Sequence, residues 1–103
     1  MDDETFKSEI LRRLDRAVSM LEILAAERLA EKRRNMEEKY LKTDIQRRIW
    51  SEIDGRSSLA DIAKRVGVSG ETVRLLVRDL EQDPDRILEV SSVGRGRYPK
   101  KLI

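Results

Sequence analysis

The chain has 103 residues, of which 39% are hydrophobic, 41% are charged and only four are aromatic, and its formal net charge is +2. That length allows one small domain with a mostly aliphatic core, together with one accessory element. Cysteine and histidine are both absent, which excludes disulfides, thiolate chemistry, the commonest general base and the commonest metal ligand.

The composition also argues against a membrane protein and against an enzyme. No apolar run approaches the roughly 18 residues of a membrane span, and no secretory signal is visible, so we expect a cytoplasmic protein with no membrane partner. No carboxylate cluster has metal-ligand spacing, and no glycine-rich loop joins a strand to a helix, so we expect neither catalysis nor a cofactor nor a metal. Arginine outnumbers lysine and asparagine is rare, which is consistent with a thermophilic source.

Residues 1–42 are predicted to form one long amphipathic helix. The first 54 residues contain neither Gly nor Pro and are rich in good helix formers. A helix from about Asp3 to Leu41 would be about 60 Å long at about 1.5 Å per residue, and it could not bury its own apolar stripe. We expect the stripe to pair with a second copy of the chain as a coiled-coil-like homodimer, in either orientation; the alternative is that the helix folds back on its own C-terminal half. The stripe consists of Ile10, Leu11, Leu14, Ala17, Val18, Leu21, Leu24 and Ala25.

A second helix is predicted over residues 44–54. Thr43 and Gln46 have the spacing of a capping box, and the Asp54–Gly55 pair is typical of a helix end followed by a turn. We therefore favour a break near residues 41–43, although a single unbroken helix from 3 to 54 is the alternative. The expected apolar face of the second helix consists of Ile45, Ile49, Trp50 and Ile53.

Residues 58–81 are predicted to form two helices joined by a short turn. Ser58 would begin the first helix, Gly67 would end it in a left-handed conformation, and Ser69 would cap the second. The small side chain of Ala63 allows the two helices to approach closely, and Val68 is an apolar turn residue that can pack on the core. The inward face of the second helix is expected to consist of Val73, Leu76, Val77 and Leu80.

The C-terminal residues are predicted to form a β-hairpin with a basic tip. Ile87, Leu88 and Val90 are typical of a strand, SVGRGRY contains two glycines and indicates a turn, and Tyr98–Ile103 would return as the second strand. Pro99 confines that strand to an edge or shortens it, because proline cannot donate to the ladder. No acidic residue follows Glu89, whereas four basic residues do: Arg95, Arg97, Lys100 and Lys101.

The stretch LADIAKRVGVSGETVRLLVRDL, with a helix before it and a hairpin after it, resembles the winged helix-turn-helix DNA-binding domain of bacterial and archaeal transcription regulators. The resemblance covers about residues 44–103. It implies a mainly α fold with a small β-hairpin wing, in which a winged helix-turn-helix over residues 43–103 is preceded by the long dimerisation helix of residues 1–42.

The resemblance also implies how double-stranded DNA would be bound. The recognition helix, residues 69–81, would enter the major groove, and the basic wing, residues 92–101, would meet the backbone or the minor groove. We thus expect a homodimeric, DNA-binding transcriptional regulator; the alternative is a winged-helix protein-interaction module that scaffolds a larger assembly, such as a partition or transcription complex. The expected DNA-binding residues are Ser69, Gly70, Glu71, Thr72, Arg74, Leu75, Arg78, Arg95, Arg97, Lys100 and Lys101.

The sequence leaves open the roles of Gly70 and Glu71, at the start of the recognition helix. Gly70 has no side chain for base reading, but it lets the backbone come close to a phosphate. Glu71 could accept a hydrogen bond from a cytosine amino group, hold Arg74 or Arg78 in place, or only favour the helix N-terminus. Arg74 and Arg78 are four residues apart and share one face, where they could read bases or simply be solvated.

Overall fold

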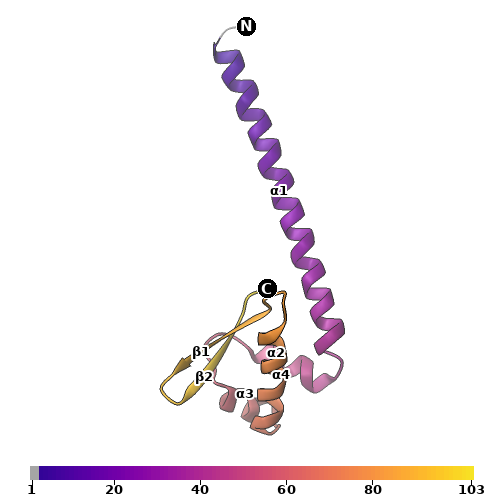
Figure 1. The fold of residues 1–103 in the computed structure, drawn as a ribbon, viewed down its shortest axis with the longest axis vertical. Helices are drawn as coiled ribbons and strands as arrows, with labels where there is room; N and C mark the ends of the chain where they lie inside the picture. The colour runs from indigo at the N-terminus through magenta and orange to yellow at the C-terminus, as the bar shows by residue number, and fades with distance from the viewer. Residues whose placement is uncertain (1–2) are drawn as a thin grey trace. The chain divides into compact units, whose positions relative to one another are not determined.

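The computed structural model describes residues 3–103, and over that range the chain forms helices followed by a two-stranded antiparallel hairpin (Figure 1). This confirms the expected class, mainly α with a small β-hairpin. The elements are α1 (Asp3–Tyr40), α2 (Asp44–Glu52), α3 (Leu59–Val66), α4 (Gly70–Gln82), β1 (Leu88–Val93) and β2 (Gly96–Lys101).

The chain divides into two compact units between Glu31 and Lys32, which is earlier than the boundary expected at residues 42–43. The reason lies in the last turns of α1. Met36 is 2% exposed and Leu41 is 7% exposed, and both belong to the same buried cluster as the residues of α2, α3 and α4. The C-terminal unit, residues 32–103, therefore includes the end of α1 as part of its own core.

The chain breaks between α1 and α2, as the capping-box spacing predicts, and the unbroken helix over residues 3–54 is wrong. The Thr43 hydroxyl accepts a hydrogen bond from the Gln46 amide at 3.2 Å, and the Gln46 side-chain oxygen accepts one from the Thr43 amide at 3.0 Å. These two bonds satisfy N–H groups that have no partner inside the new helix. The break is thus stabilised locally, by the residues that form it.

The turn between α3 and α4 also follows the prediction. Gly67 has a φ of 78°, in the left-handed region, and its amide donates to the Ala63 carbonyl at 2.9 Å. Ser69 caps α4, because its hydroxyl accepts a hydrogen bond from the Thr72 amide at 3.2 Å. Together these residues end one helix and begin the next within three positions, which fixes how α4 leaves α3.

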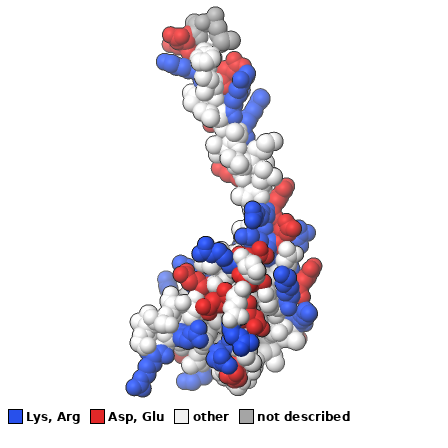
Figure 2. Space-filling model, viewed as in Figure 1, with Lys and Arg blue, Asp and Glu red and all other residues white. Residues whose placement is uncertain are grey.

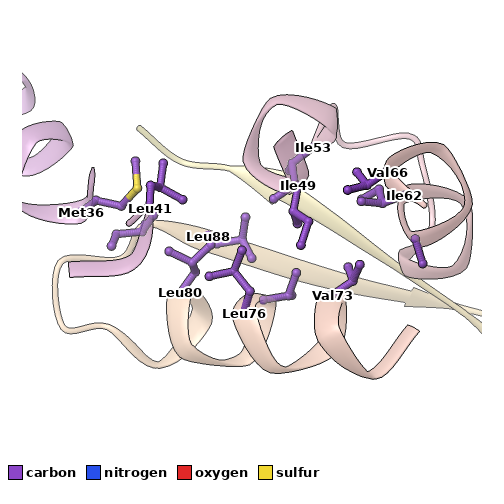
Figure 3. Packing of buried hydrophobic residues seen from close by; sticks show 13 residues of the cluster. Met36, Leu41, Ile49, Ile53, Ile62, Val66, Val73, Leu76, Leu80 and Leu88 are labelled. Atoms are coloured by element: carbon purple, nitrogen blue, oxygen red, sulfur yellow. The ribbon is translucent and has the colours of Figure 1, made fainter. Parts of the chain in front are cut away.

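The core of the C-terminal unit lies between α4 and the elements around it. Figure 3 shows that the buried residues of α4 extend along the whole cluster, with Leu80 toward Met36 and Val73 toward Ile62. The four residues expected on the inner face of α4 are all buried, which leaves the opposite face of this helix exposed. One expectation for α2 is wrong: Ile45 is 45% exposed, whereas Ile49 is fully buried in the core and Trp50 packs against it.

The hairpin has a tighter turn than the sequence predicts. Val93 pairs with Gly96, so only Gly94 and Arg95 lie between the strands, and β2 begins at Gly96 rather than at Tyr98. Gly94 has a φ of 60°, the positive value that a two-residue hairpin turn needs. Arg97 is therefore a strand residue and not a turn residue, which corrects its expected place at the tip.

Pro99 is accommodated in β2 because its missing N–H is not needed there. It pairs with Val90 and is almost fully buried, and its carbonyl accepts a hydrogen bond from the Gly55 amide at 3.1 Å. The loop after α2 thus runs beside β2. This bond ties the hairpin to the helical part of the unit.

Candidate nucleic-acid interface

The outer face of α4 is the surface on which the expected base-reading residues meet. Residues three or four positions apart share a helix face, so Glu71, Arg74, Leu75 and Arg78 project from one side of α4, opposite the buried residues. All four are exposed, and Leu75 is 38% exposed despite being apolar. The structure therefore brings together the side chains that were predicted to form the recognition surface.

The first turn of α4 is open to solvent. Ser69, Gly70 and Thr72 are all exposed, and nothing lies within 4 Å of the position that a Gly70 side chain would occupy. The Ser69 and Thr72 hydroxyls are 2.8 Å apart and bond to each other. The N–H groups of Gly70 and Glu71 precede the first intrahelical hydrogen bonds, and such groups are the usual donors to phosphate at helix N-termini.

Arg74 is held by Glu71 through two hydrogen bonds. Arg74 Nε donates to Glu71 Oε2 at 2.9 Å, and Arg74 Nη2 donates to Glu71 Oε1. These bonds lower the pKa of the Glu71 carboxyl and raise the pKa of the Arg74 guanidinium, so both groups are charged across the physiological range. Among the roles left open for Glu71, the structure shows the one in which it holds Arg74 in place.

The other charges of α4 are also balanced. Arg78 Nη2 lies 3.6 Å from Asp79 Oδ1, and Arg97 of β2 lies 3.7 Å from Glu81 Oε2. The helix carries two arginines and three acidic residues, and on the face drawn in Figure 2 basic and acidic side chains are interspersed over the C-terminal unit. Because these pairs are solvent-exposed, each is weak and can open for a better partner.

Arg95 differs from the other expected contacts of the hairpin. It lies in the two-residue turn, is exposed, and has no ion-pair partner among residues 3–103. Arg97 projects from β2 and already has Glu81 beside it. The positive charge of the turn therefore comes from Arg95 alone.

The two lysines at the end of β2 are held by the segment around α2. The aliphatic stem of Lys100 lies against Gly55, where an added Cβ would be 3.5 Å from the Lys100 Cγ. Lys101 Nζ lies 4.7 Å from the centre of the Trp50 ring, an attractive cation–π arrangement, while burial lowers the pKa of its ammonium group. The predicted basic end of the hairpin is thus divided between the turn and the α2 side.

The stripe predicted for self-association is uncovered in the N-terminal unit. Leu11 is 61% exposed, Leu21 is 66% exposed and Leu24 is 55% exposed, and the other large members of the stripe are exposed to a similar degree. Apolar exposure of this extent along a helix is typical of a surface that a partner covers.

A hydrogen bond between Tyr40 and Asp83 was not predicted. Tyr40, the last residue of α1, donates to Asp83 Oδ2 at 2.5 Å, and Asp83 is the capping residue directly after α4. The bond raises the pKa of Tyr40 to about 12. Burial disfavours the Asp83 charge, but donation by Tyr40 and by the Asp85 amide, helped by Lys39, holds the pKa of Asp83 below its usual range. The sequence signals only the local Asp83–Asp85 turn, since 43 positions separate the tyrosine from the aspartate.

Comparison of the chain with protein-family models, with curated proteins and with solved structures finds no match in any of the three. Across residues 3–103, none of the helices has the length and apolarity needed to cross a bilayer. Within the same residues, no three acidic side chains gather into a group that could hold a metal ion.

Proposed function

We propose that the chain is a homodimeric, double-stranded DNA-binding transcriptional regulator of the cytoplasm, in which the C-terminal unit is a winged helix-turn-helix. The observation that carries the proposal is the outer face of α4. Its arginines project away from the core, its first turn is open, and the preceding turn is short and contains a glycine, Gly67, as the turn of such a motif often does. In this proposal α4 is the recognition helix and the hairpin is the wing.

Backbone phosphates would be contacted by groups that are free of acidic partners. Arg95 supplies a guanidinium at the hairpin turn that has no ion-pair partner within residues 3–103, and the first turn of α4 supplies the Ser69 hydroxyl and the N–H groups of Gly70 and Glu71. Such contacts fix the orientation of a domain on DNA without reading its sequence. Arg74 and Arg78, further along α4, would face the base edges.

The exposed stripe of α1 would supply the dimer. Pairing two copies through Leu14, Leu21 and their neighbours would remove this apolar surface from water, which is the main driving force for association. Two recognition helices held by one dimer would read half-sites about 34 Å apart, one turn of DNA, so the binding site would be pseudo-palindromic.

Fluorescence anisotropy with a labelled duplex of random sequence tests the proposal. We expect micromolar or tighter binding at about 50 mM salt, weakening steeply toward about 200 mM because the release of counterions from the DNA is less favourable at higher salt. Because a dimer carries two copies of Arg95, Arg95→Ala should reduce the magnitude of the salt slope by about 2, about 1 for each lost phosphate contact, and Arg97→Ala should reduce it less because Glu81 already offsets its charge. Arg12→Ala, which removes the same charge from the N-terminal unit, is the control and should leave the slope unchanged.

A second candidate function is favoured by the ion pairs of α4. Glu71, Asp79 and Glu81 offset the nearby arginines, and Leu75 offers an exposed apolar side chain on the same face. That combination suits a protein partner better than a polyanion, and it supports a winged-helix interaction module within a larger assembly. Absence of duplex binding at any salt concentration would contradict the regulator and favour this second function.

A further inference from the structure

The hydrogen bonds between Arg74 and Glu71 use only one edge of the guanidinium group. The donors are Nε and Nη2, which lie on the side of the group, and the acceptors are the two oxygens of one carboxylate. A guanidinium has five N–H donors: one on Nε and two on each Nη. Three of them, the two on Nη1 and the outer one on Nη2, therefore remain available to another partner.

Two of these donors, one N–H on Nη1 and the outer N–H on Nη2, point the same way from the end of the guanidinium, so the end is itself a two-pronged donor; the second Nη1 N–H points back toward the side-chain stem. Guanine presents two acceptors, N7 and O6, side by side in the major groove, and a bidentate arginine is their commonest specific partner. Adenine replaces the O6 acceptor with a donor amino group, and so cannot accept both bonds. An arginine whose side edge is occupied and whose end is free is therefore matched to guanine.

The Glu71 carboxylate also makes it less favourable for Arg74 to contact a backbone phosphate. A free arginine on an exposed helix face can turn toward the nearest phosphate, which is a contact without sequence information. The Glu71 carboxylate fixes the orientation of the guanidinium and cancels its net charge, so the pair as a whole is not drawn to the backbone. Arg78 lies one turn later and has Asp79 as its nearest carboxylate at 3.6 Å, without a comparable pair of bonds.

We infer that Glu71 is a positioning residue that commits Arg74 to reading guanine at one position in each half-site. The inference rests on the proposed function, because it names what one pair on the DNA-facing surface recognises. In this arrangement Glu71 lowers the affinity for DNA in general, since it adds a negative charge to the interface, and raises the selectivity for one base.

The test is a selection of bound duplexes from a randomised pool, made with the full-length chain and three variants. Glu71→Gln removes the charge and the bidentate acceptor. Arg74→Lys keeps a positive charge but loses the planar fork. Glu81→Gln is the matched control, because it removes one exposed negative charge from the same helix and leaves the Glu71–Arg74 pair intact. Affinity for a random-sequence duplex is measured beside each selection.

We expect the wild type to prefer guanine at one half-site position by about tenfold or more. Glu71→Gln should reduce that preference to about threefold or less while increasing the affinity for random-sequence DNA, because Arg74 becomes free to contact phosphate. Arg74→Lys should also lose the preference, whereas Glu81→Gln should keep it and raise only the general affinity.

Two results would overturn the assignment of Glu71 and leave the proposed function standing, and a third would overturn both. If the wild type binds DNA and Glu71→Gln retains the full base preference, the assignment of Glu71 is overturned and the regulator stands. The assignment is also overturned if Glu81→Gln loses the preference as much as Glu71→Gln does, since general charge would then explain both. If the wild type binds no duplex at all, the proposed function is overturned and the assignment fails with it.

Discussion

Replacement of Tyr40 by phenylalanine removes a single hydroxyl and keeps every carbon atom of the core. That hydroxyl donates to Asp83 Oδ2 at 2.5 Å, and the Asp83 side chain is only 2% exposed. In the variant Oδ2 would keep only the Lys39 ammonium, at 3.9 Å, while Oδ1 would still accept from the Asp85 amide at 2.8 Å. The substitution therefore leaves a buried carboxylate with one strong donor instead of two.

The expected cost follows from these contacts. A hydrogen bond to a charged group contributes about 1.5–3 kcal/mol, and a buried acceptor left short of donors costs a similar amount. Because Lys39 can approach and compensate in part, we expect Tyr40→Phe to lower the free energy of unfolding by about 2 kcal/mol at pH 7. Urea denaturation followed by Trp50 fluorescence measures this change, at one fixed protein concentration since dimerisation would add to the apparent stability.

The stability difference between the wild type and Tyr40→Phe should depend on pH, in a direction that follows from the pKa shifts of Asp83 and Tyr40. The folded state lowers the pKa of Asp83, so its contribution is present above the unfolded value of about 3.9 and is lost as the pH falls through the folded value. The difference between wild type and variant should therefore shrink in acid. The folded state raises the pKa of Tyr40 to about 12, so its contribution is present below about pH 10 and is lost between pH 10 and 12.

Tyr98→Phe is the matched control, because the Tyr98 hydroxyl makes no hydrogen bond to residues 3–103. Its free energy of unfolding should change by less than about 0.5 kcal/mol. A Tyr40→Phe variant that is as stable as the wild type at pH 7, or a Tyr98→Phe variant that is equally destabilised, would refute the reasoning.

Two further pairs of variants test the turn and the domain boundary. Gly67→Ala should lower the free energy of unfolding by about 1–2 kcal/mol, because Gly67 has a φ of 78°. Gly70→Ala is the control: Gly70 has open space around it and no positive φ, so its replacement should be neutral or stabilising by up to about 1 kcal/mol. Equal effects of the two substitutions in thermal unfolding would contradict the left-handed turn. Met36→Ala should lower the free energy of unfolding by about 2–5 kcal/mol, because Met36 is 2% exposed. Met20 is 67% exposed, so Met20→Ala should change it by less than about 0.5 kcal/mol. A Met36→Ala variant as stable as the wild type would show that α1 contributes nothing to the C-terminal core.

The helix caps, the turn at Gly67 and the buried face of α4 could be predicted from the sequence because they depend on local interactions along the chain. Thr43 and Ser69 cap helices through bonds to residues three positions later, and Gly67 adopts a conformation that its lack of a side chain permits. Each of these features depends on fewer than five consecutive residues. The burial of one face of α4 follows in the same way from the helical repeat.

Features that depend on tertiary contact could not be predicted. The Tyr40–Asp83 hydrogen bond joins residues 43 positions apart, and no sequence pattern around either residue indicates that the two are paired. The start of β2 depends on strand register, which the two glycines of the turn allow in more than one way. For the candidate site, spacing placed Glu71 within reach of Arg74, but only the structure shows that the carboxylate takes the side edge of the guanidinium.

Sedimentation velocity of the full-length chain with a labelled duplex tests the central claim most directly, because it reports binding and the number of chains together. At about 50 mM salt and micromolar protein we expect the duplex to sediment as a complex with two chains, and to be released as the salt is raised toward about 200 mM. Protein and duplex that sediment separately under the low-salt condition would contradict the account, and a complex with one chain would contradict its dimer.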